Sequence, residues 1–173
     1  MNRVVPRENQ YEIEISDATP AIIRKHSLND EQALLAIVQY NRLIDIFLGV
    51  TAYSLQNQVR TNIPKLGQIE TGEIYVGFRN TPDKFVISAR VMGGTDQLQA
   101  VQLQHDRAFC GHYFPNLNCR LIAVQFKRAH NRIVMYEVTV QNDEIKVVEE
   151  RHFRLISASE ITDDDLIPMR HLK

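Results

Sequence analysis

Hydrophobic residues recur three and four positions apart in one long segment of the chain, residues 29–48. This spacing places them along one face of a helix. Asn29 can cap the start of the segment, and Gly49, directly after its last apolar residue, suits the left-handed end of a helix. The pattern therefore predicts a single amphipathic helix over residues 29–48.

A second helical pattern follows a pair of glycines at 93 and 94. Asp96 stands three residues before Gln99, which is the spacing of a capping box, and apolar residues then recur at helical intervals as far as His112. Pro115 restricts the residue before it to extended conformations. We therefore expect a second helix that begins near Asp96 and ends before Pro115.

Between and after these helices, apolar and polar residues alternate, as they do in half-buried strands. The alternation predicts a hairpin made of residues 69–78 and 85–92. It also predicts later strands at residues 120–126, 132–140 and 144–149, with 151–156 extending the last one. The polar stretch 53–61 is expected to begin as helix and to end by Pro64.

The order of these elements is helix, strands, helix, strand and then further antiparallel strands. This order is typical of an α/β sandwich with a mixed sheet. No internal repeat, low-complexity tract or Gly/Ser linker divides the chain. We therefore expect one domain over residues 1–173, with its core at about 29–156 and short terminal extensions.

The composition is that of a folded globular protein, with 173 residues of which 44% are hydrophobic and 24% charged. No apolar run approaches the ~18 residues of a membrane span, and the first twenty residues lack the apolar stretch of a signal peptide. These features favour a cytoplasmic protein with no membrane partner. The net charge of −1 means that any contact with nucleic acid must be local.

The sequence holds no phosphate-loop, dinucleotide-turn, His-Glu-x-x-His or Gly-x-Ser-x-Gly motif. Four potential zinc ligands cluster within fifteen residues, namely His105, Cys110, His112 and Cys119. They lack a Cys-x-x-Cys pair, so two reduced thiols that pack as small apolar side chains are the favoured interpretation.

Glu70 and Glu73 are a second candidate site, made of two carboxylates close together in the sequence. On one continuous strand, Glu70 would share a face with Gly72, and Glu73 would project from the other face. A carboxylate on an inward face needs a hydrogen-bonding partner or a cation. A metal ligand and a solvated sheet edge are equally open from this pattern.

Several strings, taken together, resemble a bacterial endonuclease-like family of the PD-(D/E)xK (restriction-endonuclease-like) superfamily. The similar strings cover most of residues 32–156: residues 40–47 (YNRLIDIF), 53–57 (YSLQN), 67–70 (GQIE), 73–77 (EIYVG), 93–96 (GGTD), 114–120 (FPNLNCR) and 125–126 (QF). The resemblance implies a restriction-endonuclease-like core. In that core, a mixed sheet bears the active site on adjacent strands between two helices, and extra antiparallel strands follow.

In that superfamily, acidic residues hold Mg²⁺, and a lysine activates water and offsets charge on the reacting phosphate. The resemblance assigns Glu70 and Glu73 to two glutamates of the motif, as metal ligands. It places Gly72 where an aspartate is usual, and Arg90 and Met92 where a glutamine and the lysine are usual. Gly72 has no side chain to bind a cation, and Met92 has no proton or charge to offer. We therefore expect hydrolysis to be lost or impaired.

The resemblance also implies DNA as a partner. Cations that could contact phosphates lie in the hairpin and in the turn after residue 126: Arg79, Lys84, Arg90, Lys127, Arg128, His130 and Arg132. Gln102 and Asp106 match the family's polar pattern on the second helix. Helix capping and helix–sheet hydrogen bonding explain these two residues more simply.

Three functions follow from these observations. The favoured one is an endonuclease-like protein that binds DNA with hydrolysis lost or impaired. The second is an active Mg²⁺-dependent endonuclease with rearranged residues, in which Lys84 is the nearest substitute for the lysine and Asp45 is an additional metal ligand. The third is a protein-interaction scaffold, which the low net charge favours. Mg²⁺ is expected only in the second case, and a homodimer is one option because nucleases that act on duplexes often dimerise.

Overall fold

The computed structural model describes residues 3–25, 30–80, 83–127, 131–160 and 164. Its strands are β1 (Glu12–Ser16), β2 (Thr51–Gln56), β3 (Arg60–Ile63), β4 (Gly67–Glu70), β5 (Glu73–Phe78), β6 (Lys84–Met92), β7 (Asn118–Phe126), β8 (Arg132–Gln141) and β9 (Glu144–Ile156). Its helices are α1 (Ala21–Lys25), α2 (Glu31–Tyr40), α3 (Leu43–Leu48) and α4 (Ala100–Tyr113), with a short 3₁₀ turn at Ala158–Glu160. No helix among these described residues is long and apolar enough to cross a membrane.

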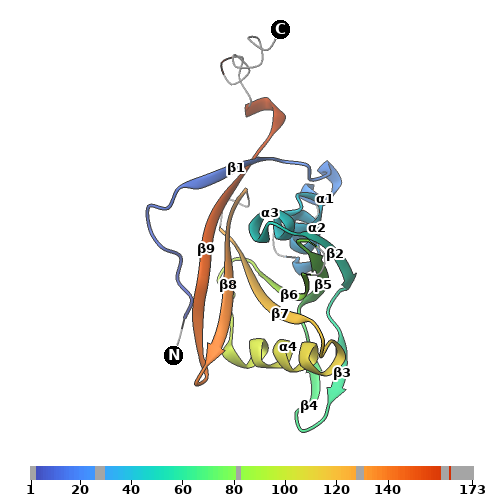
Figure 1. Cartoon of the computed structure of the whole chain (residues 1–173). Coiled ribbons are helices and arrows are strands. Elements are labelled where there is room, and N and C mark those ends of the chain that lie inside the picture. The colour runs from blue at the N-terminus through green and yellow to red at the C-terminus, as the bar shows by residue number, and fades with distance from the viewer. Residues whose placement is uncertain (1–2, 26–29, 81–82, 128–130, 161–163, 165–173) are drawn as a thin grey trace.

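Seven strands form one mixed sheet in the order β1-β9-β8-β7-β6-β5-β2 (Figure 1). β5 and β6 pair antiparallel, whereas β6 and β7 pair parallel because the crossover through α4 returns the chain to the same end of the sheet. β7, β8 and β9 then form an antiparallel meander. The predicted α/β class with a mixed sheet is confirmed.

The two faces of the sheet pack against different apolar cores, and the side chains of β6 point alternately to one face and the other. Ile87, Ala89 and Val91 point to the face covered by α2 and α3, where the largest apolar cluster lies. The alternate residues of β6 point to the other face, where α4 packs. Every second residue of β6 therefore belongs to the same side of the molecule.

The predicted single helix over 29–48 is wrong, because it is broken into α2 and α3. Arg42 takes a left-handed conformation at the break, with φ of +50°. The neighbouring Asn41 is buried, and its side-chain amide donates to the Ile37 carbonyl at 2.9 Å and accepts from the Ala18 amide at 2.8 Å. The helical period continues through this point, but the tertiary hydrogen bonds of Asn41 with Ala18 and with the Thr19 hydroxyl end the helix there. Gly49 ends α3 in the left-handed conformation, as predicted.

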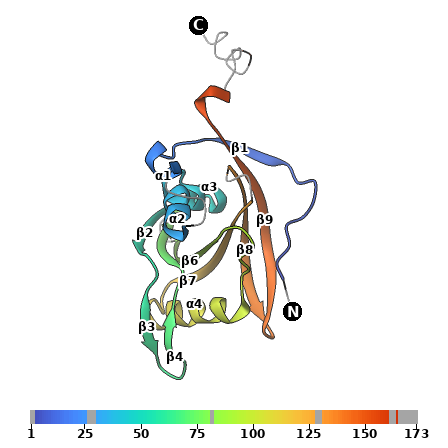
Figure 2. The same cartoon turned by 180° about the vertical axis from the view of Figure 1, so that it is seen from behind.

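Two predictions around the hairpin are also wrong. Residues 53–61 do not begin as helix, because their first part forms β2 at the edge of the sheet. The predicted strand 69–78 is divided at Thr71 and Gly72 into β4 and β5. β4 pairs with β3 in a separate two-stranded sheet beside α4 (Figure 2). The antiparallel pairing of β5 with β6 is confirmed.

The second helix begins later than predicted and ends where predicted. Gln99 is its N-cap and forms a capping box with Gln102, so the Asp96 to Gln99 spacing was the wrong box. The later strands are confirmed, and 144–156 is one continuous strand. The N-terminal β1 was not predicted, and it pairs parallel with β9, so the sheet extends beyond the expected core of 29–156.

Candidate functional site

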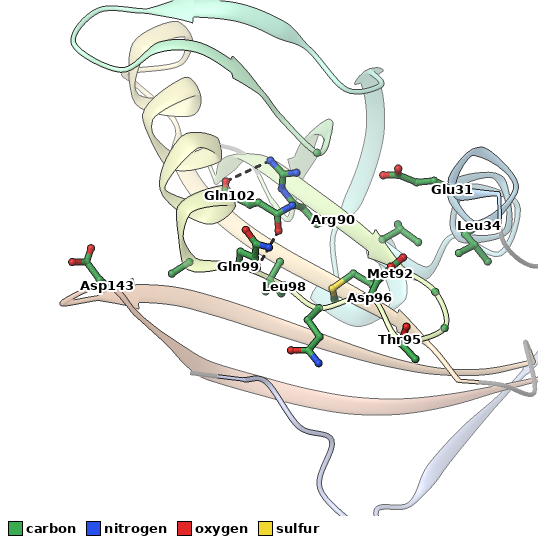
Figure 3. Close-up of a pocket in the computed structure, with 16 residues that line it drawn as sticks. Glu31, Leu34, Arg90, Met92, Thr95, Asp96, Leu98, Gln99, Gln102 and Asp143 are labelled. Atoms are coloured by element: carbon green, nitrogen blue, oxygen red, sulfur yellow. Dashed lines mark hydrogen bonds between the residues drawn. The ribbon is translucent and has the colours of Figure 1, made fainter. Parts of the chain in front are cut away.

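Three of the residues identified by the resemblance line the same open pocket of about 900 Å³. Gly72 precedes β5, and Arg90 and Met92 lie on β6 facing α4. The loop between β6 and α4 forms one wall, and Glu31 of α2 and Asp143 of the β8–β9 turn stand at the rim (Figure 3). The strand pairing thus brings together positions that are up to twenty residues apart in the sequence.

The main polar interaction at this pocket is an ion pair between Arg90 and Asp106. The Arg90 guanidinium donates through Nε to Asp106 Oδ2 at 2.9 Å and through Nη2 to Asp106 Oδ1 at 2.7 Å. Nη2 also donates to the main-chain carbonyl of Glu70 at 2.8 Å. Two parallel bonds between a guanidinium and a carboxylate are a strong, directional arrangement. The ion pair joins β6, α4 and the end of β4.

Asp106 is fully buried, and its carboxylate is completely engaged. Besides the two bonds from Arg90, it accepts from the Ser88 hydroxyl at 2.9 Å and from the Gly72 amide at 3.3 Å. Four donors on two oxygens satisfy a buried carboxylate without a metal. Helix–sheet hydrogen bonding, the simpler interpretation of Asp106 from sequence, is confirmed, as is capping for Gln102.

Gly72 is required here for steric reasons. A Cβ at this position would lie 2.5 Å from the main-chain oxygen of Ala89, which is closer than real Cβ contacts. An aspartate at 72 therefore needs a backbone shift of β6. Met92 is largely buried beside Leu98 and Leu103. These contacts explain why the two positions carry small and apolar residues in this chain.

Glu73 lies on β5 and belongs to the opposite face of the sheet from Arg90. Its buried carboxylate accepts from the Gln39 amide of α2, from the Ser54 hydroxyl at 2.9 Å and from the Tyr75 hydroxyl. Burial and the nearby Glu73 carboxylate raise the pKa of Tyr75, so its hydroxyl stays a neutral donor. The donors that surround Glu73 are all uncharged. The sequence analysis did not identify Gln39, Ser54 and Tyr75 as partners of Glu73, although Tyr75 lies two residues after Glu73 and so on the same face of a strand.

Glu70 lies on β4, in the two-stranded sheet, and its side chain is 42% exposed. Its carboxylate pairs with Arg60 of β3 at 3.0 Å. The two glutamates predicted as metal ligands are thus bonded to different partners in different sheets. Within the described part of the chain, no group of three or more His, Cys, Asp and Glu side chains is arranged to hold a metal ion.

Asp45, the additional ligand considered for an active enzyme, is paired with Arg42 through Nε at 2.8 Å. It also accepts from the Ala52 amide at 3.2 Å. A small cavity of about 200 Å³ lies beside it, lined in part by Gln39 and Tyr75. Asp45 therefore lies on the Glu73 face of the sheet and apart from Glu70.

The predicted nucleic-acid contacts fall at two ends of the sheet. Arg79 and Lys84 are exposed at the turn between β5 and β6. Lys127 follows the end of β7, and Arg132 begins β8 and pairs with Glu12 at 3.3 Å. Because β6 and β7 run parallel, these ends are separated by roughly 26 Å, the length of eight residues in a strand. Arg128 and His130 lie outside the described residues.

The cysteines and histidines of the zinc hypothesis lie along α4 and at the start of β7. Cys110 is buried in an apolar cluster with Phe109, and Cys119 packs against the same cluster. His112 contacts the Tyr113 ring edge to face, with centroids 4.8 Å apart. The packing of Cys110 as a buried apolar residue agrees with the favoured interpretation of the sequence.

Comparison of the chain with protein-family models, with curated proteins and with solved structures found no match.

Proposed function

We propose that this chain is an endonuclease-like protein that binds nucleic acid without hydrolysing it. The observation that carries the proposal is the Arg90 guanidinium, held by Asp106 and by the Glu70 carbonyl where the resemblance expects catalytic groups. A guanidinium offers fixed positive charge and directional donors, but it neither binds and acidifies water nor exchanges a proton near neutral pH. Phosphodiester hydrolysis needs an activated water, which Arg90 does not supply.

The carboxylates support the same conclusion. The Asp106 oxygens accept four hydrogen bonds, and Glu73 is enclosed by three neutral donors. A divalent ion at either carboxylate would have to displace buried donors, each of which would then lose its partner at a cost of about 1–3 kcal/mol. Both carboxylates therefore stabilise the fold in the proposed function and take no part in catalysis.

Binding in this proposal uses cations at the two ends of the sheet, of which Arg79 and Lys84 are exposed and Lys127 is half-buried. Arg79 and Lys84 lie at one end, and Lys127 lies roughly 26 Å away at the other. A duplex that reached both ends would extend over roughly eight base pairs, at about 3.4 Å each. Such contacts neutralise phosphates without reading bases, so binding should be independent of sequence and sensitive to salt.

The absence of hydrolysis is tested with supercoiled plasmid in Mg²⁺ or Mn²⁺. We expect no nicking or linearisation above that of a preparation carrying Arg90→Met, because both proteins lack a metal-activated water. Cleavage by the unmodified protein that disappears in Glu70→Ala or Glu73→Gln would refute the proposal.

Binding is tested by fluorescence anisotropy with a random duplex of about twenty base pairs at ~50 to 200 mM salt. Lys84→Gln should weaken binding and lower the slope of log K against log salt by about 0.9, the effect of losing one phosphate contact. Lys65→Gln is the matched control, because Lys65 is an exposed lysine in the β3–β4 turn, outside the proposed surface. Equal effects of the two substitutions would mean that only net charge matters.

A protein-interaction scaffold is the second candidate, and one observation favours it. Glu31, Asp96 and Asp143 surround the pocket that contains Arg90, so this pocket is acidic and repels phosphate. If no duplex binding is measured at ~50 mM salt, where non-specific binding is strongest, the scaffold function replaces nucleic-acid binding.

A further inference from the structure

A second, smaller cavity of about 270 Å³ adjoins the pocket that contains Arg90, and the loop between β6 and α4 lines both. The other walls of this cavity are the N-terminal segment 3–6, the end of β7 and Tyr136 of β8. The N-terminal segment runs beside β9 before it enters β1 (Figure 1), and the Arg7 amide donates to Glu150 of β9 at 3.0 Å. Of the residues that line this cavity, the proposed nucleic-acid surface uses only Lys127.

The cavity has an apolar floor and a polar rim. Its buried lining residues are Met92, Leu98, Phe126 and Tyr136. Its exposed or half-buried polar side chains are Arg3, Thr95, Asp96, Gln97, Gln125 and Lys127. Among the described lining residues, Arg3 and Lys127 are the cations and Asp96 is the acid, so the rim is net positive. This division suits an amphipathic ligand with its apolar part inside and its anionic end at the rim.

Packing alone does not explain the hydroxyl of Tyr136. Tyr136 is 1% exposed, and within the described chain its hydroxyl oxygen is buried without a hydrogen-bond partner. Gln125 lines the same cavity, but its amide donates to the main-chain carbonyls of Met92 and Phe126. A phenylalanine would fill the same space without an unpaired polar group. Because buried polar groups are nearly always hydrogen-bonded, we look for the partner of this hydroxyl outside the chain.

The charges around Tyr136 determine which partner fits its hydroxyl. Burial and the negative charge of Glu150 raise the pKa of Tyr136, so the hydroxyl is a neutral donor. The Glu150 carboxylate is itself bonded to the Arg7 amide and to His152, each at 3.0 Å. Glu150 would repel a second carboxylate placed at the hydroxyl, whereas a neutral hydroxyl or carbonyl oxygen is tolerated there. The anionic end of a ligand therefore belongs at the rim, beside the two cations.

We propose that this cavity is a binding site for a small carboxylate whose apolar body ends in a neutral hydrogen-bond acceptor. The carboxylate lies at the rim near Arg3 and Lys127, the body contacts the apolar floor, and the acceptor takes the hydrogen bond of the Tyr136 hydroxyl. Because this hydroxyl is shielded from solvent, contact with it requires a local outward movement of the partly exposed segment 3–6. A cavity of about 270 Å³ is slightly below the range for drug-sized ligands, which limits the body to about one aromatic ring or a short chain.

The test is isothermal titration calorimetry of the full chain with para-hydroxyphenylpropionate, which carries the carboxylate, one ring and the acceptor. Phenylpropionate lacks the acceptor, and tyramine has an ammonium group in place of the carboxylate. We expect the hydroxylated acid to bind about threefold to tenfold more tightly than phenylpropionate, which is the effect of one neutral hydrogen bond. Tyramine should bind more weakly than either acid, because the rim is net positive.

Two variants test the two ends of the site separately. Tyr136→Phe should bind both acids equally, and its melting temperature should be no lower than that of the parent, because it loses only an unpaired hydroxyl. Lys127→Gln should weaken the binding of both acids about threefold and keep the preference for the hydroxylated one. Lys65→Gln is the matched control and should bind both acids as the parent does, because Lys65 is exposed in the β3–β4 turn and does not line the cavity.

Any of four results would overturn the proposal. The first is no binding of the hydroxylated acid to the unmodified chain at millimolar concentration, and the second is tyramine binding as tight as that of this acid. The third is a preference for the hydroxylated acid that survives in Tyr136→Phe, since the acid would then bind elsewhere. The fourth is a melting temperature of Tyr136→Phe below that of the parent, which would mean that the hydroxyl already has a partner, such as a buried water. The proposed nucleic-acid function does not use Tyr136, so the two proposals fail independently.

Discussion

Replacing Arg90 with methionine would remove one half of a buried ion pair and leave the Asp106 carboxylate without its cation. Asp106 would lose two of its four hydrogen bonds, those of 2.9 and 2.7 Å from Nε and Nη2. Breaking a buried pair from one side costs about 3–5 kcal/mol. Because the Arg90 side chain is 15% exposed and water can reach it, we expect the lower end, about 3 kcal/mol of unfolding free energy.

The measurement is urea unfolding followed by circular dichroism. With a slope of about 2 kcal/mol/M, a loss of about 3 kcal/mol lowers the midpoint by roughly 1.5 M. Arg90→Met combined with Asp106→Leu removes both charges, and should recover much of the loss because no unpaired buried charge remains.

Lys146→Met is the matched control, since Lys146 pairs with Glu144 at 3.0 Å at the exposed start of β9. Exposed pairs contribute about 0–1 kcal/mol, so its midpoint should move little. If Arg90→Met moved the urea midpoint no further than Lys146→Met does, the reasoning would be refuted. So would a double variant whose loss equals the sum of the two single losses.

Three further predictions concern the stability of the fold. Gly72→Ala should lower the free energy of unfolding by about 1–3 kcal/mol, because the added Cβ would clash with the Ala89 carbonyl. Gly111→Ala in α4 should raise it by about 0.5–1 kcal/mol, because a Cβ there has no neighbour within 4 Å. Thermal melts in which Gly72→Ala is the more stable variant would contradict this. Glu73→Ala should cost about 2–4 kcal/mol, because three buried donors lose their acceptor, and a urea midpoint unchanged from the parent would show that these donors find other partners. Burial opposes ionisation of Asp17, but the hydrogen bonds from Thr19 and the charge of Arg24 lower its pKa overall. The stability from Asp17 is therefore present above about pH 4, the unfolded value, and is lost as pH falls further, so Asp17→Asn should flatten acid unfolding below pH ~4; a slope equal to that of the parent would exclude this role.

The site could be predicted from sequence only in part. The resemblance identified Gly72, Arg90 and Met92, and strand pairing brings these three to one pocket. The metal role of Glu70 and Glu73 stays a prediction, and their carboxylates have other partners here. A lone sequence gives no sign of which side chains will surround a buried carboxylate, because those partners come from other elements.

The sequence by itself determined the elements whose signal is local. The alternation of apolar residues placed β6 and the three later strands, and Pro115 placed the end of α4, since side-chain period and backbone restriction act over a few residues.

Tertiary contacts determined where an element ends although its apolar period continues. Buried hydrogen bonds of Asn41 divide α2 from α3, although the apolar spacing runs through the break. The partner of Arg90 was decided in the same way, because Asp106 lies sixteen residues away and reaches it only when α4 packs on β6. A buried polar group must find a partner, and only the packed chain determines which one is within reach.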